Sequence, residues 1–94
     1  MTNLSLLARE ALDRIADDYE ASHTITTEIA AALDRKISEL EVREALLSLA
    51  DQGLAQAFVY DQGVQQFAAV APAAALPKQE LWFRCTPLGR AEII

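Results

Sequence analysis

The chain lacks the features that mark several large classes of protein. It has a single cysteine, Cys85, so it can form no internal disulfide. It has no apolar run approaching the ~20 residues that a membrane-spanning helix needs. Its first residues do not show the basic and apolar regions of a secretion signal. From these absences we expect a protein that enters no membrane and resides in the cytoplasm.

Basic residues are also scarce. The 94 residues include 8 Lys and Arg against 14 Asp and Glu, which gives a formal net charge of −6. The excess acid lies in residues 1–53, which hold eleven acidic and five basic residues, whereas residues 54–94 hold three of each. DNA-binding modules usually carry a basic patch and a high pI, and the pI of this chain is about 4.6. Non-specific attraction to nucleic acid or to an anionic membrane is therefore disfavoured.

The residues that catalysis and metal binding require are few. His23 is the only histidine, and a metal site needs several converging ligands. The carboxylate pairs Asp17/Asp18 and Glu39/Glu41 diverge on a helix, because neighbouring residues are turned by about 100°. No nucleophile or glycine-rich phosphate loop accompanies them. We therefore predict a non-enzymatic protein with no catalytic residues, no metal, no cofactor and no small-molecule substrate.

Two helices are predicted in the first third of the chain. Residues 4–20 place apolar side chains on one face at the 3.6-residue period, and charged side chains cover the other face. Ser22, His23 and Thr24 are expected to break this helix. Thr26 is then a good N-cap for a second helix over residues 26–35.

A third helix is predicted over residues 39–52, with a clear signal at each end. Ser38 and Glu41 have the form of a capping box, in which the serine caps the helix and the glutamate lies three positions later. Gly53 fits the position just past the last turn, where a left-handed backbone favours glycine.

The second half of the chain has the pattern of strands. We expect an antiparallel sheet with a hairpin turn at residues 61–63, a proline-containing loop over residues 71–78, and a short helix that begins with Thr86 as N-cap and Pro87 at the first position. The predicted strands span residues 55–60, 64–70 and 81–85, and the closing helix spans residues 87–93.

Two of these segments resemble the winged helix-turn-helix family of transcription regulators. Residues 41–54 (EVREALLSLADQGL) are similar to the helix that these regulators end with Leu-x-x-x-Gly-Leu/Ile. Residues 82–91 (WFRCTPLGRA) resemble their last wing strand running into a Thr-Pro/Glu-x-Gly-Arg/Lys helix start. The resemblance implies one α+β winged-helix domain over residues 1–94, with a three-helix core containing the helix-turn-helix, a small antiparallel sheet or wing, and a short C-terminal helix. Residues 64–78 depart from the family pattern, because this segment is longer than a minimal wing.

In such a fold the third helix would enter a DNA groove, yet its outward face carries the wrong charge. A helical wheel places Val42, Leu46 and Leu49 toward the core. The opposite face is acidic, and a carboxylate about 4 Å from a phosphate costs about 1 kcal/mol even in water. Reading of bases and phosphates calls mainly for Arg, Lys, Asn or Gln. The sequence therefore favours a protein partner over DNA.

The leading hypothesis is a protein-binding module that uses the outward face of the third helix, either for another protein or for homodimerisation. Leu40 and Leu47 lie seven residues apart and are rimmed by charge, as suits a protein contact. Two alternatives remain open: both leucines pack inside the monomer, or the acidic face is simply solvated. The candidate partner-contact residues are Glu39, Leu40, Arg43, Glu44 and Leu47.

The alternative hypothesis is a small winged-helix DNA-binding transcriptional regulator, as the family resemblance implies. Its candidate DNA contacts are the basic residues of the turn, the third helix and the wing, namely Arg35, Lys36, Arg43 and Arg84.

Aromatic residues are concentrated in the strands. They are interpreted either as a stacking platform for single-stranded nucleic acid or, with better support because few cations lie among them, as packing of the sheet. Trp82 and Phe83 are neighbours in a strand and must point to opposite faces. Cys85, in the same strand, is predicted to be a buried and unreactive thiol.

Overall fold

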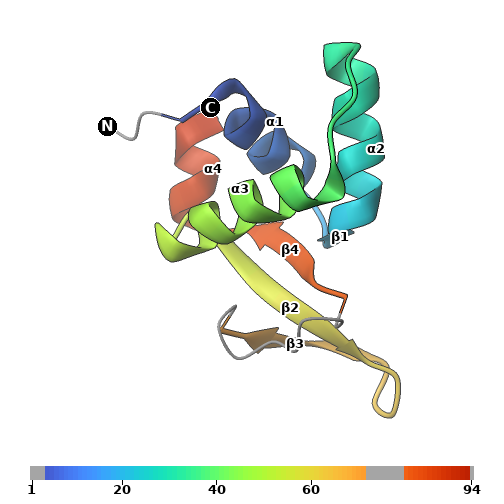
Figure 1. Cartoon of the computed structure of the whole chain (residues 1–94). Coiled ribbons are helices and arrows are strands. Elements are labelled where there is room, and N and C mark those ends of the chain that lie inside the picture. The colour runs from blue at the N-terminus through green and yellow to red at the C-terminus, as the bar shows by residue number, and fades with distance from the viewer. Residues whose placement is uncertain (1–3, 72–79, 94) are drawn as a thin grey trace.

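The computed structural model describes residues 4–71 and 80–93. In this part of the chain four helices gather on one side of a four-stranded antiparallel sheet (Figure 1). The predicted α+β class is therefore confirmed. The helices are α1 (Leu6–Arg14), α2 (Ser22–Leu33), α3 (Glu39–Asp51) and α4 (Pro87–Ile93), and the strands are β1 (Glu20–Ala21), β2 (Ala55–Asp61), β3 (Gln66–Val70) and β4 (Trp82–Cys85).

The core lies between the helices and the inner face of the sheet. Val42, Leu46 and Leu49 are fully buried, which confirms the core face predicted for the third helix. They belong to one buried cluster with Ala55 and Ala57 of β2, whose side chains are small enough for α3 to lie close to the strand. A fully buried Leu or Val contributes about 1.5–3 kcal/mol, so this stripe fixes the position of α3 on the sheet.

The first helix is shorter than predicted. It ends at Arg14, and residues 15–19 leave the helix instead of continuing it to residue 20. The Cys85 N–H donates to the Ile15 carbonyl over 2.9 Å, and β1 then pairs with β4. Sheet pairing with a distant strand thus overrides the helical periodicity, a tertiary effect that local propensity does not register.

The second helix begins earlier than predicted. It starts at Ser22 and ends at Leu33, so residues 22–24 open a helix instead of breaking one. Thr26 is not the N-cap; its Oγ1 donates to the Ser22 carbonyl over 2.7 Å inside the helix. The last turn closes at Asp34, whose φ of 51° is left-handed, and this stops the helix before residue 35.

Both predicted signals at the ends of α3 are confirmed. The Ser38 Oγ accepts from the Glu41 N–H over 3.1 Å. At the other end Gly53 has a φ of 77°, and the Leu54 N–H donates to the Leu49 carbonyl over 2.9 Å. This is the Schellman arrangement, which turns the chain from the helix directly into β2.

The end of α3 is joined to the start of α4. Thr86 caps α4 as predicted, since its Oγ1 accepts from the Gly89 N–H over 3.0 Å. The same Oγ1 donates to the Gly53 carbonyl over 2.6 Å, and the Thr86 N–H donates to the Leu54 carbonyl over 3.1 Å. A Cβ on Gly89 would lie 1.9 Å from the Leu54 carbonyl oxygen. Only glycine fits there.

The sheet has the strand order β1-β4-β2-β3. β2 pairs with β3 as a hairpin and also with β4, which places Phe58 opposite Trp82. β3 begins at Gln66 and not at residue 64, because the turn is longer than predicted and extends to Gln65, whose φ is 55°. β4 begins at Trp82, one residue later than expected. The predicted loop over residues 71–78 lies, apart from Ala71, outside the described residues.

Candidate protein-binding site

The start of α3 presents an acidic surface with one apolar side chain at its centre. Leu40 is 65% exposed, and Glu39, Glu41 and Glu44 are exposed around it. The carboxylate of Glu39 accepts from the Ser22 Oγ over 3.1 Å, which ties this turn of α3 to the start of α2. The surface is therefore built on two packed helices and not on a mobile loop. We call Glu39, Leu40, Glu41 and Glu44 the α3 acidic surface.

The other two candidate residues of α3 lie differently. Leu47 is half-buried and packs against the hydrophobic core, so it does not form one exposed strip with Leu40. Arg43 is also half-buried and has an interaction partner. The structure thus places Leu40 alone as the exposed apolar group of the predicted contact face.

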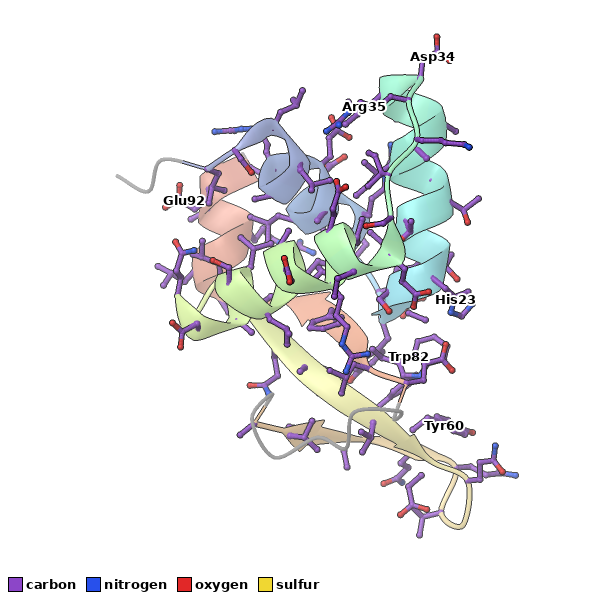
Figure 2. All side chains as sticks on the ribbon, in the orientation of Figure 1. His23, Asp34, Arg35, Tyr60, Trp82 and Glu92 are labelled. Atoms are coloured by element: carbon purple, nitrogen blue, oxygen red, sulfur yellow. The ribbon has the colours of Figure 1, made fainter. Side chains whose placement is uncertain are left out.

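The candidate DNA-contacting cations are spread over separate parts of the molecule. Arg35 and Lys36 are exposed just beyond α2. Figure 2 shows Arg35 at the end of that helix far from His23 and Trp82. Arg84 pairs with Gln56 in the register of β4 with β2, and it alternates with the buried Phe83, so it points away from the helices. Arg84 thus lies on the sheet face that points away from the helices, whereas Arg35 and Lys36 adjoin the end of α2.

The outer face of the sheet carries an aromatic cluster. Tyr19 stacks on Phe67, with ring centroids 4.1 Å apart and planes 6° from parallel, and it meets Phe58 edge to face at 4.8 Å. Phe67 also meets Trp82 and Tyr60, both at 5.2 Å. We call these five residues the aromatic cluster. Edge-to-face and stacked pairs each contribute about 0.5–1.5 kcal/mol beyond area burial, which gives the outer sheet face a small core of its own.

Sequence reasoning missed Tyr19 as a member of this cluster, because the apolar periodicity assigned it to a helix. The signal that was available is that Tyr19 follows Asp17 and Asp18, which are unfavourable at a helix C-terminus. The predicted opposition of Trp82 and Phe83 is confirmed: Phe83 is fully buried and Trp82 lies on the outer face. The guanidinium carbon of Arg84 lies 5.1 Å from the Tyr19 ring centroid, so this arginine already has an aromatic partner.

Of two surface depressions among the described residues, the first borders the cluster, and the charged groups Glu80 and Arg90 beside them already have partners. The first is lined by Tyr60 and Trp82 together with Glu80, whose Oε1 lies 2.8 Å from His23 Nδ1. The second lies beside Arg90, which donates to the Ala16 carbonyl over 2.5 Å and to Asp17 over 2.9 Å. Among residues 4–71 and 80–93 no group of three or more His, Cys, Asp or Glu is placed to hold a metal ion.

Two ionisable groups are shifted by their surroundings. Partial burial raises the pKa of the Glu20 carboxyl, and the charges of Glu28 and Asp18 raise it further. Partial burial likewise raises the pKa of the Cys85 thiol, partly offset by Arg90. Cys85 is half-buried and its Sγ donates to the Thr86 carbonyl over 3.3 Å. Both shifts favour the neutral form, and a neutral thiol is a poor nucleophile.

Among the described helices none is long and apolar enough to cross a membrane. Comparison of the chain with protein-family models, with curated proteins and with solved structures finds no match.

Proposed function

We propose that the chain is a winged-helix module. The order of its helices and strands supports this, with α2 and α3 as the helix-turn-helix and the sheet after them as the wing. The two segments that resemble the family also meet in space, since Thr86 bonds to the carbonyls of Gly53 and Leu54. β3 departs from the winged-helix pattern. In a minimal wing the chain would turn from β2 directly into β4, whereas here β3 adds a further strand at the outer side of β2.

We further propose that this module is not an enzyme and binds a protein through the α3 acidic surface. The observation that carries this proposal is Leu40, an apolar side chain 65% exposed among three exposed carboxylates. Such a residue has no role in the core of the monomer, and burying it in a partner's pocket would contribute about 1–2 kcal/mol. A central apolar anchor with a charged rim is the usual plan of a protein–protein contact.

The charge of this surface defines the partner. Glu39, Glu41 and Glu44 favour a protein that presents Lys or Arg around a pocket for leucine, since complementary charges direct association and register. If two copies met through their α3 helices, the carboxylates of one copy would face the same carboxylates of the other and repel them. Each chain already has a net charge of −6. The α3 acidic surface therefore suits a basic protein better than a second copy.

Affinity capture with paired variants tests this function. The wild-type protein, Leu40→Ala and Leu88→Ala serve as baits, since Leu88 is 58% exposed on α4 and is a matched control. We expect a basic protein that wild type and Leu88→Ala capture, and that Leu40→Ala binds about tenfold more weakly in a titration, with affinity falling as salt rises. If no captured protein depends on Leu40, the proposed function is wrong.

A second candidate is DNA binding, which the family resemblance and the exposed Arg35 and Lys36 support. A gel shift at low salt tests it, because electrostatic attraction is strongest there. Changing Glu39, Glu41 and Glu44 together to glutamine should produce weak non-specific binding if their charge is the only barrier. If neither the wild type nor this variant shifts DNA at low salt, DNA binding is excluded.

A further inference from the structure

The two edges of the sheet differ in how they are protected. β1 forms one edge; it is two residues long and carries Glu20, with Asp18 just before it. Short edge strands with charged side chains resist pairing with other chains. β3 forms the other edge, it is five residues long, and it has neither a charged residue nor a proline.

The β3 edge lies in an uncharged part of an acidic molecule. Residues 62–71 contain no Asp, Glu, Lys, Arg or His, although the chain as a whole has a net charge of −6. In this stretch Val64 is 63% exposed, and Ala68 and Ala69 are exposed on β3 itself. Figure 1 shows β3 at the side of the sheet farthest from α1 and α2. Two copies can therefore bring their β3 strands together with little opposition from charge.

The backbone of β3 is suited to such a contact. Only β2 pairs with it among the described residues, so every second residue of the strand directs its N–H and C=O outward. The end of the strand is held in place by Gln56, whose Nε2 donates to the Val70 carbonyl over 3.2 Å. An ordered edge strand that, among the described residues, is paired on one side only is a template for one more antiparallel strand.

From these observations we propose that β3 pairs with β3 of a second copy, joining two sheets across a two-fold axis. A two-fold axis perpendicular to the sheet leaves the inner face of both copies on one side of the joined sheet and the outer face on the other. Each residue of β3 must therefore pair with a residue whose side chain lies on the same face, and these residues alternate along the strand. Centred on Ala68, it places Phe67 opposite Ala69 of the second copy and Gln66 opposite Val70, which uses the whole strand. A centre at Phe67 would bring in Gln65, whose φ of 55° is not extended. A large residue opposite a small one also lets the strands approach closely.

This dimer does not depend on the proposed function, because β3 and the α3 acidic surface are different elements. It extends the aromatic cluster of each copy toward that of the other, since Phe67 belongs both to the cluster and to β3. The α3 acidic surfaces stay free for their own partner. Leu40→Ala should consequently leave the dimer intact.

Introducing a charge at Ala68 tests the pairing, because Ala68 of one copy is placed opposite Ala68 of the other. Sedimentation of the wild type over a range of concentrations should give a dimer of twice the 10.3 kDa chain mass. Ala68→Lys and Ala68→Glu alone should each raise the dissociation constant about tenfold, since like charges then face each other. An equimolar mixture of the two variants should restore the dimer. Ala31→Lys, at an exposed position on α2, is the control with the same change of charge.

Three outcomes overturn the proposal: a wild type that is monomeric at every concentration, a dimer that neither variant weakens, and weakened variants whose mixture does not recover. Circular dichroism of each variant checks its folding. Amide hydrogen exchange of the wild type gives an answer without substitution. Exchange within β3 should slow as the protein concentration rises, while exchange in β1 stays constant. Exchange in β3 that is independent of concentration also overturns the proposal.

Discussion

Replacing Gly89 with alanine tests how the start of α4 is fixed to the end of α3. The added Cβ would lie 1.9 Å from the Leu54 carbonyl oxygen and 2.9 Å from the Cys85 Sγ. Since the nearest obstacle is backbone, α4 must move by more than about 1 Å, which is a severe case of overpacking. That movement also breaks the bonds of Thr86 to the Gly53 and Leu54 carbonyls.

The expected loss of stability follows from these contacts. Overpacking costs about 1–3 kcal/mol, and each lost hydrogen bond costs about 1 kcal/mol. Alanine recovers about 0.5–1 kcal/mol of helix propensity. We therefore expect Gly89→Ala to lower the free energy of unfolding by about 3 kcal/mol and the Tm by roughly 10–20 °C. Urea unfolding followed by the fluorescence of Trp82, the only tryptophan, measures this change.

Gly53→Ala is the matched control, because it separates backbone strain from a clash. Gly53 has a φ of 77°, but a Cβ added to it would have Leu88 Cδ2 as its nearest neighbour, at an ordinary contact distance of 3.8 Å. Its substitution should cost only about 1 kcal/mol, which is the strain of a left-handed alanine. If Gly89→Ala costs no more than Gly53→Ala, the close approach of α4 to the Leu54 backbone is refuted.

Three further predictions concern the sheet and its neighbours. Phe67→Ala should remove the centre of the aromatic cluster, cost about 2 kcal/mol and change the fluorescence of Trp82; an unchanged spectrum would contradict the ring contacts. The pKa of the Glu20 carboxyl is raised in the folded state. The contribution of this group to the free energy of unfolding is therefore fully present below its ordinary pKa of 4.5 and is lost as the pH rises through the raised pKa. Glu20→Gln should therefore raise the Tm at pH 7 and change it little below pH 4.5; equal effects at both pH values would disprove this. The raised pKa of Cys85 predicts that a thiol reagent at pH 7 reacts more slowly with the folded than with the urea-unfolded protein, and equal rates would contradict it.

The helix ends show where sequence reasoning succeeds. The cap at Ser38, the left-handed Gly53 and the Thr86 cap were all predicted, because each depends on groups within a few residues of one another. The first two helices show where it fails. Residues 15–20 were predicted to be helical but leave the helix to reach β4, about sixty residues further along the chain.

The candidate site shows the same division. The sequence identified the acidic start of α3 and the exposed face on which Leu40 lies, since both follow from helical geometry alone. It could not separate Leu40 from Leu47, because the burial of Leu47 depends on the rest of the core. Nor could it place Tyr19 in the aromatic cluster, which needs the strand pairing of β1.

Local sequence is enough to predict the α+β class, the ends of α3 and α4, and the sign of the charge on the α3 acidic surface. These properties are set by local backbone preferences, short-range capping and composition. The tertiary fold sets which residues leave α1 for the sheet, that β3 pairs with β2 alone among the described residues, and that Gly89 must be glycine. Each of these depends on contacts between segments far apart in the chain, whose free energy outweighs local preference.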